Sequence, residues 1–350
     1  MKYFRTIGAE IYNYFRGNKD PLIKRLFLYT LKYFGKIGFE QRWNLVIDRF
    51  CYGETFTPLD YEDFCEVSSN WHFGFHGPLD NGAQKFFLET LKLYKRYFPN
   101  STFSYSSVKT SNLEEVEAYC RKLNLKLILI EDPGEVQDFG ARNILRQVNS
   151  TFANIEYCQE IGKKYFIKNR IDQRVTNPYF LGYCKFMLTA FSSSETQSGT
   201  RVFGTSFNTY RNRKVGLSDM LQFGHVREMA RYWSPMTTSN YNELLNYYQD
   251  QYVDSDWNQF LLVEQFLGFR FLAGYSIPNK IARLGDRVFW KDFAGVVDSA
   301  AIGQIWSRSG PFVQTNLSSF PWFGGNGPSN LREYRHIEWV VETQSQELIF

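Results

Sequence analysis

The sequence predicts an α/β protein in which a mainly parallel sheet is flanked by helices. Between residues 71 and 190, short apolar or aromatic segments alternate with amphipathic segments of about 10–15 residues, as in βαβ units. One short segment, LKLILI at 125–130, is apolar enough to be covered on both faces, which is typical of strands in parallel sheets. Another, Tyr165–Ile167, ends abruptly in charged residues, as expected where a buried strand opens into solvent.

The elements can be placed in order from their periodicity and end signals. The expected strands are residues 72–79, with a tight turn at Gly77-Pro78, 101–106, 125–130, 165–167 and 199–207. The expected helices are residues 83–98, 112–123, 143–162, 177–189, 225–233, 244–252 and 257–266. Pro99 ends the first of these helices, and Asn112 caps the second, whose first turns are acidic. A turn is expected at Gly224.

Residues 1–70 read as a basic, aromatic and helical extension. Residues 1–50 hold ten Lys or Arg and four Asp or Glu, a net charge of +6, whereas the whole chain carries +4. A basic amphipathic helix can lie on an anionic membrane surface. The alternative is a helix packed on the main domain with its lysines in water.

Two further regions follow this extension. Residues 71–190 are expected to form the α/β region. Residues 191–350 are less periodic and are expected to pack on the same domain. Within them, residues 310–330 are rich in Gly, Pro, Asn and Ser with embedded aromatics, which suits either an active-site lid or an ordinary loop.

Composition excludes several classes of protein. A net charge of +4 disfavours a general nucleic-acid binder. The five cysteines lack CxxC spacing and read as reduced core thiols of a cytoplasmic protein. The four histidines form no metal motif, and neither a Walker-A sequence nor GxGxxG is present. No secretory signal and no run of about 18 apolar residues is seen.

Charged residues gather directly after the strand at 165–167. Arg170, Asp172 and Arg174 follow it, and in open α/β sheets ligands lie beyond the carboxyl ends of the strands. Asp172 is therefore either a site residue or a turn residue paired with one of the two arginines.

A second candidate site opens the helix at 143–162. Arg142 and Arg146 lie four residues apart and project from one face. Arginines at a helix N-terminus make a good receptor for pyrophosphate. The alternative is that both pair with the acidic residues of 131–138.

Five motifs together resemble a known family. They are FHGPLDN (75–81), EDPG (131–134), ARNILRQVNST (141–151), KYFIKNRIDQRV (164–175) and LSDMLQFG (217–224). In this order they resemble the WavE family of lipopolysaccharide-synthesis proteins, which are regarded as bacterial glycosyltransferases. The resemblance covers roughly residues 72–270 and implies a GT-A-like fold. Residues 71–190 would bind the nucleotide-sugar donor, and the irregular region at 191–350 would bind the acceptor.

The resemblance also implies roles for individual residues. Gly77 and Pro78 would lie near the nucleotide, and Asn143, Arg146 and Gln147 would border the donor pocket. Asp172 would take the place of the DxD aspartate and hold a divalent Mn or Mg ion.

The sequence departs from DxD because Arg174 stands where the second acid would be. Arg170 or Arg174 could instead neutralise the diphosphate directly. For an inverting reaction, Asp219 is the first candidate for the catalytic base and Asp256 the second. Each of these two aspartates could equally be a helix cap.

The function expected is transfer of a sugar from a nucleoside-diphosphate sugar to a hydroxyl of a bacterial surface glycan, of lipopolysaccharide or capsule type. The acceptor would be a glycan or lipid-linked oligosaccharide, and the enzyme would be cytoplasmic, peripheral to the inner membrane through residues 1–50. The alternative is a non-catalytic carbohydrate- or partner-binding protein on the same scaffold. A nucleic-acid protein is a weaker third possibility.

Overall fold

The computed structural model describes nine stretches of the chain, all within the unit Asp60–Phe350. These stretches are residues 67–79, 81–109, 113–136, 143–211, 213–252, 263–275, 284–307, 310–311 and 333–344. Residues 1–66 of the extension predicted at 1–70 lie outside the described residues. So do Asp256, Arg142 and nearly all of the predicted lid. The predicted division at residues 70 and 190 stays a prediction.

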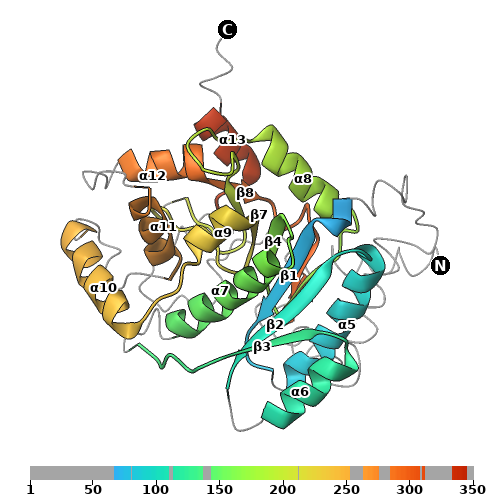
Figure 1. Cartoon of the computed structure of the whole chain (residues 1–350). Helices are drawn as coiled ribbons and strands as arrows, with labels where there is room; N and C mark the ends of the chain where they lie inside the picture. The colour runs from blue at the N-terminus through green and yellow to red at the C-terminus, as the bar shows by residue number, and fades with distance from the viewer. Residues whose placement is uncertain are drawn as a thin grey trace, which may run out of the picture. The chain divides into compact units, whose positions relative to one another are not determined.

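A seven-stranded sheet forms the centre of this unit (Figure 1). Its strand order is β3-β2-β1-β4-β7-β6-β8. The strands are β1 (Trp71–His76), β2 (Thr102–Val108), β3 (Lys126–Ile130), β4 (Tyr165–Arg170), β6 (Val202–Thr205), β7 (Leu221–His225) and β8 (Ala294–Val297). All neighbouring pairs are parallel except those made by β7, which runs antiparallel to both β4 and β6. The predicted α/β class, with a mainly parallel sheet flanked by helices, is confirmed, while the GT-A-like assignment stays a prediction.

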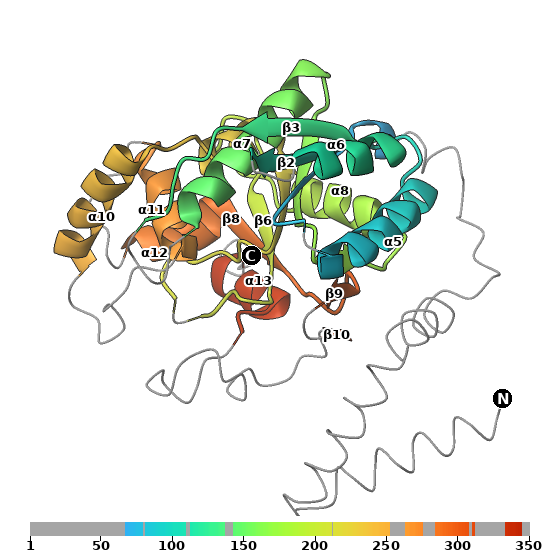
Figure 2. The ribbon, with the colours of Figure 1, turned by 90° about the horizontal axis from the view of Figure 1, so that it is seen from below.

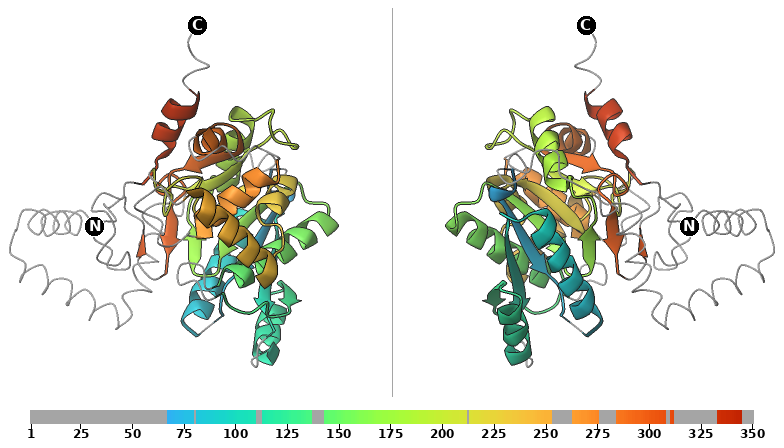
Figure 3. Two further views of the ribbon diagram at one scale, coloured as in Figure 1. Left: turned by 90° about the vertical axis from the view of Figure 1, so that its left-hand side faces the viewer. Right: turned by 90° about the vertical axis from the view of Figure 1, so that its right-hand side faces the viewer.

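Helices cover both faces of the sheet (Figure 2). On one face α7 (Ile144–Glu160) contacts β1 to β4, and α9 (Val226–Tyr232) contacts β4, β6 and β7. On the other face lie α5 (Asn81–Tyr97), α6 (Leu113–Lys122), α8 (Phe180–Ala190) and α13 (His336–Gln344). α6 and α13 contact the edge strands β3 and β8, and Figure 3 accordingly shows them at opposite ends of the sheet.

The remaining elements follow β7 or form a small second sheet. The helices are α10 (Thr238–Tyr252), α11 (Val263–Ala273), α12 (Leu284–Val288) and a π-helical turn (Phe289–Phe293). The three-stranded sheet consists of β5 (Gln173–Val175), β9 (Gln304–Trp306) and β10 (Gly310–Pro311), with β9 in the middle. None of the described helices is both long and apolar enough to cross a bilayer.

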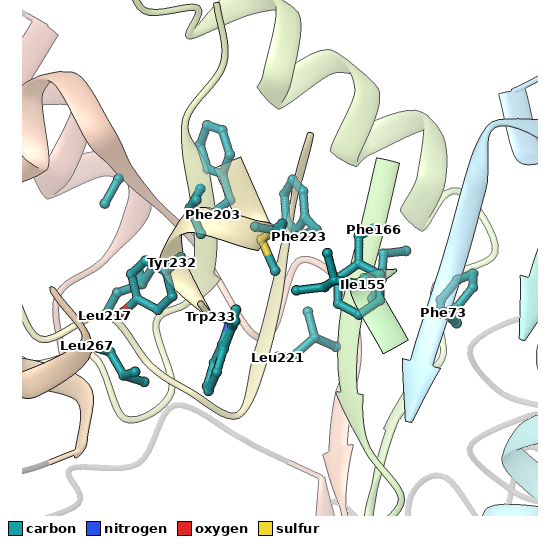
Figure 4. Packing of buried hydrophobic residues seen from close by; sticks show 14 of the residues in the cluster. Phe73, Ile155, Phe166, Phe203, Leu217, Leu221, Phe223, Tyr232, Trp233 and Leu267 are labelled. Carbon is teal, nitrogen blue, oxygen red and sulfur yellow. The ribbon is translucent and has the colours of Figure 1, made fainter. Parts of the chain in front are cut away.

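Aromatic side chains fill the core on both sides of the central strands. Figure 4 shows Phe73, Phe166, Phe223 and Phe203, one from each of the neighbouring strands β1, β4, β7 and β6. The rings of Phe203 and Phe223 stack at 5.3 Å. These four rings serve as packing surface, because they are fully buried.

The two faces of β1 differ in kind. Trp71, Phe73 and Phe75 turn toward the α5 face, where large rings pack, while His72, Gly74 and His76 turn toward α7. A Cβ atom at Gly74 would lie 2.5 Å from the ring of Phe166 and 2.7 Å from Asn154. The glycine therefore allows α7 to lie close against the sheet.

Several predicted elements needed correction. Gly224 is not in a turn but within β7, and a Cβ there would meet Met229 of α9 at 3.3 Å, so close helix packing explains this glycine. The helix predicted at 244–252 begins earlier, at Thr238. The helix predicted at 257–266 is described from Val263 and extends to Ala273. The three described cysteines are buried free thiols, as predicted.

Gly74→Ala should lower the free energy of unfolding by about 1–3 kcal/mol, because the added methyl group has no space between Phe166 and Asn154. Gly182→Ala is the matched control, since nothing lies within 4 Å of a Cβ at that exposed position of α8. It should be neutral or stabilising by up to about 1 kcal/mol. Urea unfolding of both variants measures the difference, and equal effects would refute the close packing at Gly74.

Candidate functional site

The candidate site lies at the carboxyl ends of β1 and β4. His76, the last residue of β1, stands beside Arg170, the last residue of β4, in the parallel ladder. Because β7 runs the other way, Asp219 arrives at the same edge just before β7 begins. Gln147 reaches this edge from the first turns of α7. The strand-end location predicted for the site is therefore where these charges meet.

Asp172 occupies the turn between β4 and β5 and is almost fully buried. Arg170 donates to both of its carboxylate oxygens, at 2.9 and 3.0 Å. The indole N–H of Trp306, on β9, donates to Oδ2 at 2.9 Å. The predicted pairing of Asp172 with an arginine is thus present, and the partner is Arg170. Trp306, from the small sheet, adds a third hydrogen bond to the carboxylate.

Arg174 lies apart from this group. It belongs to β5, and its guanidinium is buried against α5. It donates to Thr90 Oγ1 at 3.0 Å and to the Phe86 carbonyl at 3.1 Å, and it pairs with Glu89 at 3.3 Å. These contacts hold β5 to α5 and direct the charge of Arg174 away from Asp172.

Lys168 is fully buried two residues before Arg170. Its ammonium group donates to the backbone carbonyl of Asp219 and lies 4.4 Å from the ring centroid of Trp233. Burial lowers the pKa of Lys168 to about 7, partly offset by the negative charge of Asp219. A lysine in this state is close to half protonated at neutral pH.

Among the carboxylates that act on Lys168, Asp219 raises its pKa most. Gln147 donates a hydrogen bond to its Oδ2. Burial favours the neutral acid, but the positive charges of Lys168 and Arg170 and the bond from Gln147 outweigh it and lower the pKa of Asp219. Asp219 is therefore ionised at neutral pH.

A second buried carboxylate, Glu264 of α11, lies in the electrostatic reach of Asp219. Burial raises the pKa of Glu264, and the negative charge of Asp219 raises it further. Arg213 pairs with Glu264 at 3.4 Å, and Asn208 donates to the same oxygen. Sequence reasoning missed Glu264, because an acid in an apolar helix carries no motif.

The other predicted residues line the same edge. Gly77 has a φ of +123°, which favours glycine, and its carbonyl accepts from the hydroxyl of Tyr105 at 2.8 Å. Pro78 follows it. Arg146 donates to Asp132 at 2.7 and 2.8 Å, to Glu135 at 2.8 Å and to Asn143 at 3.2 Å. The pairing with acidic residues, one of the two interpretations of Arg146, is thus present.

The side chains that could act as metal ligands give little support for a divalent ion at Asp172. Both carboxylate oxygens already accept hydrogen bonds from Arg170 and Trp306, whereas Mg²⁺ binds through free carboxylates together with phosphate oxygens. Within the described stretches, no three His, Cys, Asp or Glu side chains are grouped to hold a metal ion. The residues at this edge fit an anion held by cationic side chains better than a bound metal.

No protein-family model matches this sequence, and no curated protein matches it. Among solved structures, the chain is similar to mannose-1-phosphate geranyltransferase from Thermus thermophilus, with 10% identity, a TM-score of 0.31, and 59% of this chain and 68% of that one covered. It is also similar to the glycosyltransferase GlyE of Streptococcus pneumoniae (9%, 0.30, 57% and 43%) and to TarS of S. aureus (11%, 0.33, 58% and 33%).

The chain thus spans less than half the length of GlyE and about a third of TarS. Likenesses of this size concern the arrangement of strands and helices. They assign no function to this chain.

Lys168→Met tests the buried amine. Above pH 7 the folded state holds Lys168 neutral, while the unfolded chain keeps it charged to about pH 10.4. Unfolding then takes up a proton, so the free energy of unfolding should rise with pH between 7 and 9, by up to about 1.4 kcal/mol per unit. The variant should lose this slope.

Lys92→Met, at an exposed position of α5, is the control and should keep the slope. Urea unfolding at four or five pH values measures all three proteins. Parallel curves for the wild type and Lys168→Met would show that Lys168 does not titrate in this range.

Proposed function

We propose that the chain is a glycosyltransferase that moves a sugar from a nucleoside-diphosphate sugar to a hydroxyl group of a glycan. The observation that carries this proposal is the juxtaposition, at the carboxyl edge of the sheet, of two cationic side chains with an ionised carboxylate. Arg170 and Lys168 supply the positive charge and Asp219 the negative. A sugar transfer of this type needs both, because a diphosphate departs while a hydroxyl loses its proton.

In the reaction, the acceptor oxygen forms a bond to the anomeric carbon as the bond from that carbon to the diphosphate oxygen breaks. The nucleoside diphosphate leaves with the electron pair of the broken bond, and the proton of the acceptor hydroxyl passes to Asp219. The positive charge of Arg170 opposes the negative charge that develops on the leaving group. A bound diphosphate would also favour the protonated form of Lys168, whose pKa of about 7 leaves it poised to take up a proton.

The lowered pKa of Asp219 limits its strength as a base. Catalytic bases work best with a pKa near the working pH, and the cations beside Asp219 hold its pKa below the usual range. We therefore assign the larger part of the rate enhancement to stabilisation of the departing diphosphate. Asp256 keeps its place as the second candidate for the base, outside the described residues.

The biological context belongs to the same proposal. The motifs that resemble the WavE family support an acceptor of lipopolysaccharide or capsule type, met in the cytoplasm at the inner membrane. The +6 charge of residues 1–50 supports contact with an anionic membrane surface.

One observation favours a second candidate, a non-catalytic binder of carbohydrate or of a protein partner. Both carboxylates predicted to act, Asp172 and Asp219, already accept hydrogen bonds from neighbouring side chains. A site that has lost turnover could keep such contacts for structure alone.

Asp219→Asn should abolish transfer while leaving the donor bound. The variant is incubated with a panel of nucleotide sugars and a glycan fraction from bacterial cell surfaces, and release of nucleoside diphosphate is measured. Loss of the base should lower turnover by roughly 10²–10⁴-fold, whereas the dissociation constant for the donor should change little. Glu264→Gln, which neutralises the neighbouring buried acid, is the matched control and should keep most of the activity.

Turnover of Asp219→Asn close to that of the wild type would exclude this residue as the base. If the wild-type protein binds a nucleotide sugar but never releases the nucleoside diphosphate, the non-catalytic alternative gains the support instead.

Donor binding should also survive removal of divalent ions. Because Arg170 and Trp306 occupy the oxygens of Asp172, the affinity for nucleoside diphosphate should be the same in excess EDTA and in millimolar Mn²⁺. Isothermal titration in both conditions measures this. A tenfold or greater loss of affinity in EDTA would show that an ion takes part and that Arg170 does not replace it.

A further inference from the structure

Two histidines lie on the same face of β1, and their surroundings differ sharply. His72 and His76 are four residues apart, so both side chains point toward α7. Both are almost fully buried. The ring nitrogens of His72 are both satisfied, by Thr102 Oγ1 at 2.8 Å and Ser104 Oγ at 2.7 Å. His72 is thus a core histidine with a complete set of partners.

His76 has no such set. Its Nε2 is buried and has no hydrogen-bond partner within the part of the chain that the structure describes. A buried polar atom without a partner costs about 1–3 kcal/mol, so proteins rarely leave one without a reason. The network that satisfies His72 shows that this fold is able to supply hydroxyl partners on the α7 face of β1.

The backbone fixes where His76 lies. Its carbonyl accepts from the N–H of Ile171 at 3.1 Å, and it stands directly beside Arg170 in the β1–β4 ladder. Gly77 follows with a positive φ, so the chain turns away immediately after the imidazole. His76 therefore borders the candidate site and belongs to none of the contacts described for it.

The charges around His76 determine its ionisation. Burial, followed by the positive charges of Lys168 and Arg170, holds the pKa of His76 well below its usual value. The ring is therefore neutral at physiological pH, with one nitrogen able to donate a hydrogen bond. The same two cations attract anions, and the ladder places His76 directly beside Arg170.

We infer that Nε2 of His76 is a ligand contact, which donates a hydrogen bond from the neutral imidazole to a phosphate oxygen of a bound nucleoside diphosphate. The inference rests on the proposed function and adds to it a binding residue from β1. His76 and Arg170 together would hold the phosphate group between the ends of two neighbouring strands.

The chain contains only four histidines, 72, 76, 225 and 336, which makes this contact measurable directly. Protein labelled with ¹⁵N at histidine is titrated with UDP, GDP, ADP, CDP and dTDP, and with the corresponding unphosphorylated nucleosides. With the nucleotide that binds, the Nε2 resonance of His76 should shift and keep its proton, while the resonances of His72 stay unchanged. The dissociation constant of that nucleotide should rise roughly tenfold in His76→Asn.

His72→Asn is the matched control on the same strand face. It should lower the unfolding temperature, because it breaks two satisfied hydrogen bonds, and should leave the nucleotide affinity within about twofold. His76→Asn should lower the unfolding temperature less, because it breaks none.

Three results would overturn the inference. If a nucleotide binds but neither the His76 resonance nor the affinity of His76→Asn changes, His76 is no ligand contact and the proposed function stands. If a nucleoside alone shifts the resonance, the contact is not to phosphate. If no nucleoside diphosphate binds the wild-type protein at all, the inference and the proposed function fall together.

Discussion

The buried ammonium group of Lys168 is the constraint on which the rest of the site depends. A charge inside a protein is costly unless it is paired and hydrogen-bonded. The chain meets this requirement with the carbonyl of Asp219 and the face of Trp233. Trp233 is in turn held by its N–H on Gln222, which lies opposite Lys168 in the β4–β7 ladder. Strand β7 and the C-terminal end of α9 are thus both held in place by contacts with Lys168.

The alternation of strand residues separates packing from chemistry. On the α5 face, β1 presents the rings of Phe73 and Phe75, which pack with Tyr94 and Phe87 of α5. On the α7 face β1 and β4 present His72, His76, Lys168 and Arg170, beside the single ring of Phe166. The hydrogen bonds of Asn154 to the Phe75 carbonyl and to Ser106 bind α7 to this polar face. One pair of strands therefore supports both a rigid core and a cluster of charges, because successive side chains point to opposite faces.

The sequence predicted the first part of the fold well and the site in part. Strands β1 to β4 have five to seven residues each and are separated by helices with an amphipathic pattern, so their alternation is easy to recognise. The short strands β5, β8, β9 and β10 have two to four residues each, too few for a period to show. Asp172 was found from charges at a strand end, whereas Asp219 came from the family resemblance of the motif at 217–224. The direction of Arg174 depends on the turn before β5, and His76 and Lys168 are single polar residues in buried strands. Lys168 in YFIKNR is a signal that could have been used, since a lysine within an apolar strand is rarely buried without a purpose.

The central claim is that the carboxyl edge of β1 and β4 binds a nucleoside-diphosphate sugar through cationic side chains. Thermal unfolding of the wild type and of Arg170→Met against a panel of nucleotide sugars tests it most directly. A donor at 100 times its dissociation constant should stabilise the wild type by about 2.7 kcal/mol. We predict a selective shift for one nucleotide that is lost in Arg170→Met. An unchanged unfolding temperature with every nucleotide sugar, or an equal shift in both proteins, would contradict the account.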